Sequence, residues 1–180
     1  MQKSAFIATL LIMIFAALSP AQMSKDKSQR PSPPAQTQCT FADGKSISVN
    51  YSSPRAKGRT IFGSLVPYGE VWRTGANEAT TFVTTANLKA GNLAVPAGNY
   101  TIFTVPNQDK WTLIINKKTG EWGIPYKYES DELGRVDMQV SQTSSTVEDF
   151  TIAFDQKGST CSMSMSWERT NATTDFNESK

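Results

Sequence analysis

Residues 160–168 read TCSMSMSWE, and this short stretch decides the class of fold. Cysteine, methionine and tryptophan occupy every second position, and serine fills the positions between them. Because successive side chains of a β-strand point to opposite faces, this alternation indicates a strand with one buried face and one face toward water. Nothing in residues 38–169 sustains the helical period of an amphipathic helix.

The same signal recurs outward along the chain, in short apolar runs separated by turn residues. Residues 147–154 and 160–168 are expected to form a hairpin around Lys157-Gly158-Ser159. Further strands are expected near Cys39 and over 47–51, 80–85, 93–95, 100–105, 111–116 and 136–140. The sequence therefore predicts an all-β fold, a single antiparallel β-sandwich of jelly-roll type or a flattened barrel of about nine strands.

The first 21 residues are typical of a secretory signal peptide. Lys3 supplies a positive charge, residues 5–18 are apolar apart from Thr9, and Ser19-Pro20-Ala21 offers small residues for cleavage. An apolar run of about 14 residues is shorter than the roughly 20 that span a bilayer, although an uncleaved anchor is the alternative. We expect a secreted or periplasmic protein with no membrane span after cleavage.

Three further segments follow the leader. Residues 22–37 are rich in proline and charge, which predicts a disordered linker. Residues 38–169 have the length of one domain and should form the β-sandwich. Residues 170–180, NATTDFNESK with one preceding threonine, are polar and predict a flexible tail.

Composition excludes several classes of function. The chain has no histidine, which removes Ser-His-Asp and Cys-His catalysis and histidine-ligated metals. Two cysteines cannot complete a four-thiolate site, and no glycine-rich phosphate loop occurs. A formal net charge of +2 argues against nucleic acid as a partner. We expect no metal and no cofactor, with calcium bound by loop oxygens left open.

The two cysteines lie near the two ends of the predicted domain. Cys161 falls on the apolar side of its strand, and Cys39 shares a side with Phe41. An even number of cysteines in an exported chain favours a disulfide, with two separate buried thiols as the alternative. A bridge that closes about 120 residues would stabilise the fold by roughly 4–5 kcal/mol.

Residues 51–80, YSSPRAKGRTIFGSLVPYGEVWRTGANEAT, form an unusually long connection between two predicted strands. Long ordered loops usually carry function, so a site is expected here. Arg55, Lys57 and Arg59 should project to one side and could hold a carboxylate, a sulfate or an acidic sugar. Alternatively, these charges protect a strand edge from pairing with another chain.

The end of this connection combines turn residues with opposite charges. Arg73, Asn77 and Glu78 surround the turn at Gly75 and could converge on a ligand. The structural alternative is an internal clamp in which Arg73 pairs with Glu78 and holds the loop down.

Aromatic residues and carboxylates supply the remaining candidates. Trp122 and Tyr126 lie in a turn-rich loop and could stack on a sugar, or could plug one end of the sandwich, whereas Trp111 and Trp167 should lie in the core. Glu70 and Glu78 are weak catalytic candidates, because a pair of carboxylates can hydrolyse a glycoside when correctly spaced.

Three blocks occur in order along the chain: residues 51–80, then LAVPAGNYTIFTVP at 93–106, then KWTLIINKKTGEWG at 110–123. Together they resemble an exported bacterial family catalogued as domain of unknown function 2911, over residues 41–154. The resemblance implies a Gram-negative exported protein and brings no activity or cofactor with it. The residues that match the family pattern are Arg55, Lys57, Gly58, Arg59, Arg73, Gly75, Asn77 and Glu78.

Three functions remain open from the sequence. The leading hypothesis is a non-catalytic module that binds a small-molecule or glycan ligand at the loop end of the sandwich. The alternative is a histidine-free enzyme that acts on a glycan through Glu70 or Glu78 with Arg73. The third is an envelope-associated structural protein, for which the proline-rich linker is the indication.

Overall fold

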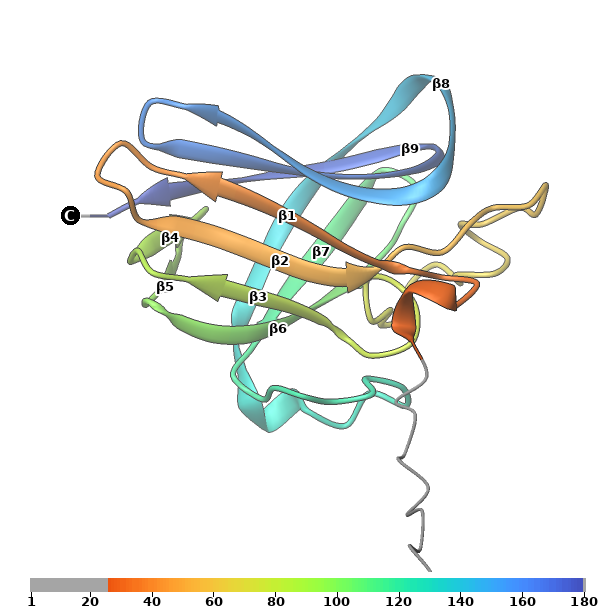
Figure 1. The fold of residues 1–180 in the computed structure, drawn as a ribbon, viewed down its shortest axis with the longest axis horizontal. Helices are drawn as coiled ribbons and strands as arrows, with labels where there is room; N and C mark the ends of the chain where they lie inside the picture. Colours follow the sequence, from red (N-terminus) through yellow and green to blue (C-terminus); the bar gives the residue numbers. More distant parts are fainter. Residues whose placement is uncertain (1–25, 180) are drawn as a thin grey trace, which may run out of the picture.

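A computed structural model describes residues 26–179, so the predicted signal peptide and residues 22–25 lie outside the described residues. These residues form nine strands and two short 3₁₀ helices (Figure 1). The elements in chain order are η1 (Lys27–Gln29), β1 (Pro34–Thr40), β2 (Ser46–Ser52), β3 (Thr80–Thr84), β4 (Leu88–Ala90), β5 (Leu93–Val95), β6 (Gly98–Val105), β7 (Lys110–Asn116), η2 (Glu129–Asp131), β8 (Glu132–Lys157) and β9 (Thr160–Glu178).

All nine strands belong to one antiparallel sheet in the order β1-β2-β3-β6-β7-β8-β9-β4-β5. The sheet is not closed into a barrel, so β1 and β5 are its two edges. The all-β class and the strand number predicted from the sequence are confirmed, and the barrel alternative is not. Within the described residues, no helix is long and apolar enough to cross a membrane.

The long strands β8 and β9 bend, which folds the sheet over its own core (Figure 1). Residues 132–139 of β8 pair with β7, and residues 139–157 pair with β9, with register shifts on both sides of Val147. The two halves of β9 face each other around Glu168, whose φ is 56°. Side-chain hydrogen bonds join these halves between Thr160 and Asn177, Ser162 and Asp175, and Ser166 and Asn171.

Two boundaries predicted from the sequence are wrong. The predicted tail over 170–180 continues β9 to Glu178, and Phe176 in it is fully buried against Phe82 of β3 at 5.0 Å between ring centroids. The predicted linker over 22–37 contains the start of β1 at Pro34. Both segments become ordered because neighbouring strands supply the backbone partners that their polar sequences still require.

The disulfide predicted from the sequence is confirmed. Cys39 of β1 and Cys161 of β9 are bonded across a sequence separation of 122 residues, and both are buried. The bond ties one edge of the sheet to the strand that lies opposite it. Trp111 and Trp167 are each 1% exposed, as expected for core residues.

Residues 53–79 close one end of the core. Ile61, Phe62 and Val66 are buried, and the ring of Phe62 lies in edge contact with three tryptophans. The centroid distances are 6.0 Å to Trp72, 4.8 Å to Trp111 and 6.2 Å to Trp167. Edge-to-face aromatic contacts add to the energy of burial, so this loop is part of the core and holds a fixed shape.

Candidate functional site

A pocket of about 430 Å³ opens between residues 53–79 and Ile124 of the following long loop, 117–131. We call it the loop pocket. Its walls are mainly apolar, and three charged side chains face it. The lining residues used below are Arg59, Leu65, Glu70, Trp72, Arg73 and Ile124. Three of the residues singled out from the sequence, Arg59, Glu70 and Arg73, therefore meet in one cavity.

Trp72 forms the fixed wall of the loop pocket. Its backbone exchanges two hydrogen bonds with Thr104 of β6, at 2.7 and 2.9 Å, which attach the loop to the sheet. Its indole Nε1–H donates to the carbonyl of Gly75 at 3.0 Å. The ring stacks on Trp167 with centroids 6.0 Å apart. A wall anchored in this way has its position set before any ligand arrives.

Arg59 is held by its own loop. Its Nε donates to the carbonyl of Ala56 at 2.9 Å, and its Nη2 donates to the carbonyl of Arg55 at 2.6 Å. Within residues 26–179 the guanidinium forms no ion pair. Neutral carbonyls orient the group and leave its charge uncompensated, which is what an anion site requires.

Arg73 is oriented by Trp122. Its guanidinium carbon lies 4.9 Å from the centre of the Trp122 ring, and Nη1 donates to the Trp122 carbonyl at 3.4 Å. Burial lowers the pKa of Arg73, an effect that the charge of Glu78 opposes. Because an arginine starts from a pKa above 12, the side chain stays charged.

A glycine permits this close approach of the two loops. Gly123 has φ +93°, a region that favours glycine. A Cβ at this position would lie 2.9 Å from the Cβ of Ala79 and 3.1 Å from the Cβ of Arg73. Neither neighbour can rotate away, so a larger residue would push Trp122 off the arginine.

Asn77 and Glu78 do not line the loop pocket, and both contact the segment before β1. Asn77 Nδ2 donates to the Ser32 carbonyl at 3.1 Å. Arg30 Nη1 donates to both carboxylate oxygens of Glu78, at 2.8 and 3.1 Å, and Lys27 lies 3.2 Å away. The clamp predicted between Arg73 and Glu78 is therefore wrong: the partner of Glu78 is Arg30.

These ion pairs bear on the catalytic alternative. The hydrogen bond from Arg30, followed by contributions that include Lys27, lowers the pKa of Glu78 to about 2. A carboxylate with this pKa carries no proton near neutral pH and does not suit general acid catalysis. Glu70 and Glu78 also line different pockets. They therefore do not share a cavity in which a glycoside could lie between them, as the paired carboxylates of glycoside hydrolysis do.

Arg55, Lys57 and Arg59 line one shallow depression of about 340 Å³, which we call the basic hollow. Arg55 Nε donates to Asp149 at 2.9 Å. The backbone N–H of Lys57 donates to Glu148 at 2.8 Å, and its φ is 49°. The row predicted from the sequence is thus gathered on one surface, and Arg59 lines both the basic hollow and the loop pocket.

Tyr126 lies elsewhere. Its hydroxyl donates to Glu132 at 2.7 Å and accepts from Asn116 at 3.2 Å, and its ring packs on Phe103 with centroids 4.8 Å apart. Burial, followed by the Glu132 hydrogen bond, raises its pKa. The structure gives Tyr126 a place in the packing of the 117–131 loop, apart from the loop pocket, whereas Trp122 remains 55% exposed beside Arg73.

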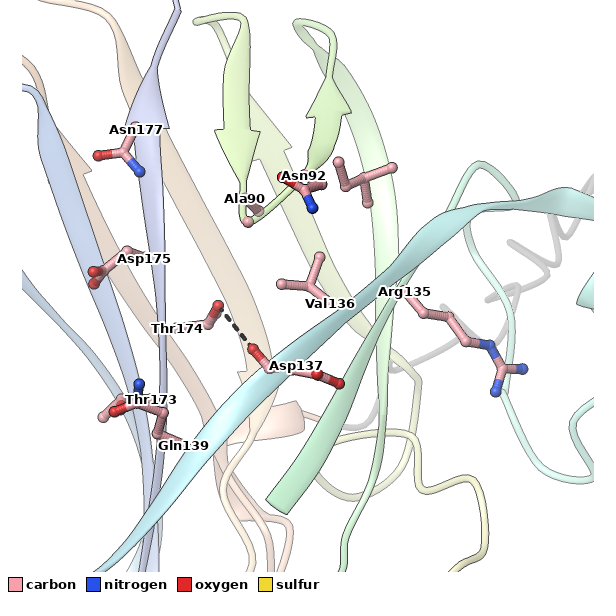
Figure 2. A pocket seen from close by; sticks show the side chains of 12 residues that line it. Ala90, Asn92, Arg135, Val136, Asp137, Gln139, Thr173, Thr174, Asp175 and Asn177 are labelled. Carbon is pink, nitrogen blue, oxygen red and sulfur yellow. Dashed lines mark hydrogen bonds between the residues drawn. The ribbon is translucent and has the colours of Figure 1, made fainter.

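A second, larger pocket of about 600 Å³ escaped the sequence reasoning (Figure 2). It opens where β9 leaves β8 after Thr173 and joins β4 at Asn177, and we call it the β9 pocket. Asp175 and Asn177 line it from β9, where both bond to side chains of the same strand. Thr174 donates across the gap to the carbonyl of Asp137 at 3.4 Å (Figure 2).

No acidic or sulfur cluster suited to a metal accompanies these pockets. Among residues 26–179, no group of three or more histidine, cysteine, aspartate or glutamate side chains could hold a metal ion. The absence of a cofactor stays a prediction.

Fold and site together define a disulfide-linked, β-sandwich-like domain with a pocket built from its loops. A family model described as "Protein of unknown function (DUF2911)" matches residues 32–176, and the chain belongs to this family. The match confirms the family suggested by the three sequence blocks and reaches beyond them at both ends, across both cysteines. Neither the curated proteins nor the solved structures gave a match.

Proposed function

We propose that the loop pocket binds a small amphipathic anion without chemical change. The apolar body of the ligand lies against Trp72 and Ile124, and its acidic group faces Arg59 and Arg73. The observation that carries this proposal is the meeting of two arginines with apolar walls in one cavity of about 430 Å³. Ligand pockets of small molecules typically combine apolar walls with a few placed polar groups.

The charges in the pocket favour an anion over a neutral ligand. The lining contains two guanidinium groups, of Arg59 and Arg73, and one carboxylate, of Glu70, so it carries a formal excess of one positive charge. Arg59 is oriented by backbone carbonyls and Arg73 by the Trp122 ring, so little ordering cost remains when the ligand binds. Hydrogen bonds from a guanidinium to an anion are among the stronger polar contacts in proteins.

Two fluorescent probes of similar shape test the proposal. Anilinonaphthalene sulfonate carries an acidic group, and N-phenylnaphthylamine presents nearly the same aromatic body without it. We expect the sulfonate to bind more tightly to the folded protein. Arg59→Gln and Arg73→Gln should each weaken the sulfonate by about tenfold and leave the neutral probe nearly unchanged.

A charge-matched control separates the pocket from the general field of the protein. Lys157→Gln removes one positive charge at the hairpin turn, where Lys157 is exposed and paired with Asp155. This variant should bind both probes as the wild type does. Equal affinity of the wild type for the two probes, or equal losses in all three variants, would contradict the proposal.

We further propose that the protein works outside the cytoplasm, in the periplasm or as a secreted protein of a Gram-negative bacterium. The Cys39–Cys161 disulfide supports this, because such bonds persist in oxidising compartments. Fractionation of the source cell, with thiol alkylation before lysis, tests it. Recovery of two alkylated thiols from the cytoplasmic fraction would contradict it.

A further inference from the structure

The large apolar side chains that remain exposed gather on two loops. Among the described residues they are Leu65, Tyr68, Trp122 and Ile124, with exposed fractions of 47%, 38%, 55% and 43%. The first two belong to residues 53–79 and the other two to 117–131. Isolated exposed apolar residues need no explanation, but a group of them confined to one surface marks a contact site.

These four residues line the loop pocket or adjoin its lining. Leu65 and Ile124 line the pocket itself, and Trp122 lies under Arg73, which also lines it. Tyr68 follows Pro67 of the pocket lining and leans over Gly63, where a Cβ would lie 2.7 Å from the tyrosine ring. Leu65, Ile124 and Trp122 thus lie at the loop pocket, Tyr68 follows its lining in the chain, and we call these four side chains the docking face.

The basic hollow continues the docking face. Arg59 and Ser32 line both the hollow and the loop pocket, so the two surfaces share an edge. Lys57 is exposed and, within residues 26–179, its ammonium group makes no ion pair. Arg55 is paired with Asp149, and Glu148 accepts from the Lys57 backbone. Among the described residues, the side chains of Lys57 and Arg59 therefore supply the unpaired positive charge beside the apolar tips.

We propose that the docking face binds the surface of a bilayer that contains anionic lipid. Tryptophan and tyrosine favour the interface between hydrocarbon and water, because their rings combine an apolar body with a polar end. Leucine and isoleucine gain by entering the acyl region, and Lys57 and Arg59 face the lipid phosphates. A second copy of the chain, with a net formal charge of +2, offers no excess of negative charge to the basic hollow, so the charge disfavours it as the occupant.

Flotation with lipid vesicles tests the proposal on the protein purified from the exporting cell. We expect binding to vesicles of phosphatidylglycerol and little binding to vesicles of phosphatidylcholine, with affinity that falls as salt is added. The tryptophan fluorescence of the protein should be partly quenched when the lipid chains carry bromine, because the exposed ring of Trp122 enters the membrane whereas Trp111 and Trp167 stay buried.

Three substitutions at the surface and one control away from it, Lys157→Gln, test the proposal. Trp122→Ala should weaken binding to phosphatidylglycerol vesicles by about tenfold, through the loss of buried apolar area. Lys57→Gln should weaken it by about fivefold, the effect of one charge near an anionic surface. Trp122→Tyr keeps an interfacial ring and should bind within about twofold of the wild type. Lys157→Gln, with its charge far from this face, should leave binding unchanged.

Three results would overturn the proposal. The first is vesicle binding that is unaffected by Trp122→Ala, and the second is equal binding to the two lipids. The third is a dimer in solution that Trp122→Ala converts to a monomer, together with no vesicle binding, which assigns the face to a second copy. Far-ultraviolet circular dichroism of each variant establishes that it is folded, and Tyr68→Ser gives a second test if Trp122→Ala fails to fold.

This inference stands apart from the proposed ligand. Tyr68, Trp122 and Lys57 do not line the loop pocket, whereas Arg73 lines it and does not line the basic hollow. Lys57→Gln and Tyr68→Ser should therefore lower vesicle binding and leave the affinity for anilinonaphthalene sulfonate in lipid-free solution unchanged. Vesicle binding without sulfonate binding contradicts only the proposed function, and the reverse result contradicts only the docking face.

Discussion

The loop pocket and the β9 pocket differ in volume and in how far their polar side chains are already engaged in hydrogen bonds and ion pairs. The β9 pocket is the larger, at about 600 Å³ against about 430 Å³. Its polar groups are largely engaged with neighbours, as Asp175 is with Ser162 and Asn177 with Thr160. In the loop pocket the charge of Arg59 is uncompensated. This unused bonding capacity is the reason why we place the proposed binding site in the loop pocket, although the β9 pocket is larger.

The walls of the two pockets also differ. The loop pocket rests on a cluster of large rings, in which Phe62 and Trp72 pack against the core tryptophans. The β9 pocket is bounded by strand edges and by the short β4–β5 hairpin, where Leu93 is only partly buried. Dense aromatic packing fixes a wall more firmly than a short hairpin does.

Removal of the disulfide should cause the largest loss in the free energy of unfolding. Because the bond stabilises the whole domain, this loss should affect both pockets equally. The double variant Cys39→Ser, Cys161→Ser should unfold with about 4–5 kcal/mol less stability, because the bond closes a loop of 122 residues in the unfolded chain. Urea unfolding followed by tryptophan fluorescence measures this. A loss smaller than about 1 kcal/mol would show that the bond contributes little.

Truncation of one side chain in each pocket wall should cost different amounts of unfolding free energy in the two pockets. Phe62→Ala should cost about 3–4 kcal/mol of unfolding free energy, since it empties the centre of the aromatic cluster. Leu93→Ala should cost about 1 kcal/mol, because the side chain is partly in water already. Equal losses in urea unfolding would remove the distinction between the walls.

Substitution of one glycine beside each pocket compares how tightly the backbone is packed in the two regions. Gly123→Ala should cost about 2–3 kcal/mol, because a positive φ is combined with contacts near 3 Å to rigid neighbours. Gly91→Ala, beside the β9 pocket, has φ +56° and its Cβ would only touch Val136 at 3.7 Å, so about 1 kcal/mol is expected. If thermal unfolding ranks Gly91→Ala as the more damaging change, the loops are not packed as described.

The smallest effect concerns the ion pair behind the loop pocket, and it depends on pH. The pKa of Glu78 is lowered from 4.5 to about 2, so the pair with Arg30 stabilises the fold above pH 4.5 and is lost as the pH falls toward 2. Glu78→Gln should therefore lose about 0.5–1 kcal/mol at pH 7, the range for an exposed pair, and should match the wild type near pH 2.

The matched control for this prediction is Glu129→Gln in η2, an exposed carboxylate. Chemical unfolding across the pH range should show no comparable change for it. A deficit of Glu78→Gln that persists unchanged at pH 2 would mean that packing, not charge, accounts for the loss.

The strands with clear alternation could be predicted from sequence, and the weakly apolar ones could not. In the first half of β9, residues 160–168, the alternation of apolar residues and serine indicates which face is buried. The half after Glu168 contains only one large apolar residue, Phe176. β1 is an edge strand with only Cys39 fully buried, so its sequence resembles a linker. In both cases pairing with a neighbouring strand makes the segment a β-strand, and the local sequence contains no pattern that predicts this pairing.

The candidate site shows the same limit. The density of charge in residues 51–80 drew attention to Arg59 and Arg73, and the fold brings these two residues into one cavity. The partner of Glu78 could not be found, because Arg30 lies 48 residues away in a segment with no structural signal. Proximity along the chain suggested Arg73 as the partner of Glu78, whereas the fold places Arg30 beside Glu78.

A nuclear magnetic resonance titration with anilinonaphthalene sulfonate tests the central claim most directly, because it reports on both pockets in one experiment. The indole N–H of Trp72 and the amide of Ala76, which line the loop pocket, should shift on binding. The side-chain amides of Asn92 and Asn177, which line the β9 pocket, should stay in place. Shifts confined to Asn92 and Asn177 would place the binding site in the β9 pocket and contradict the account.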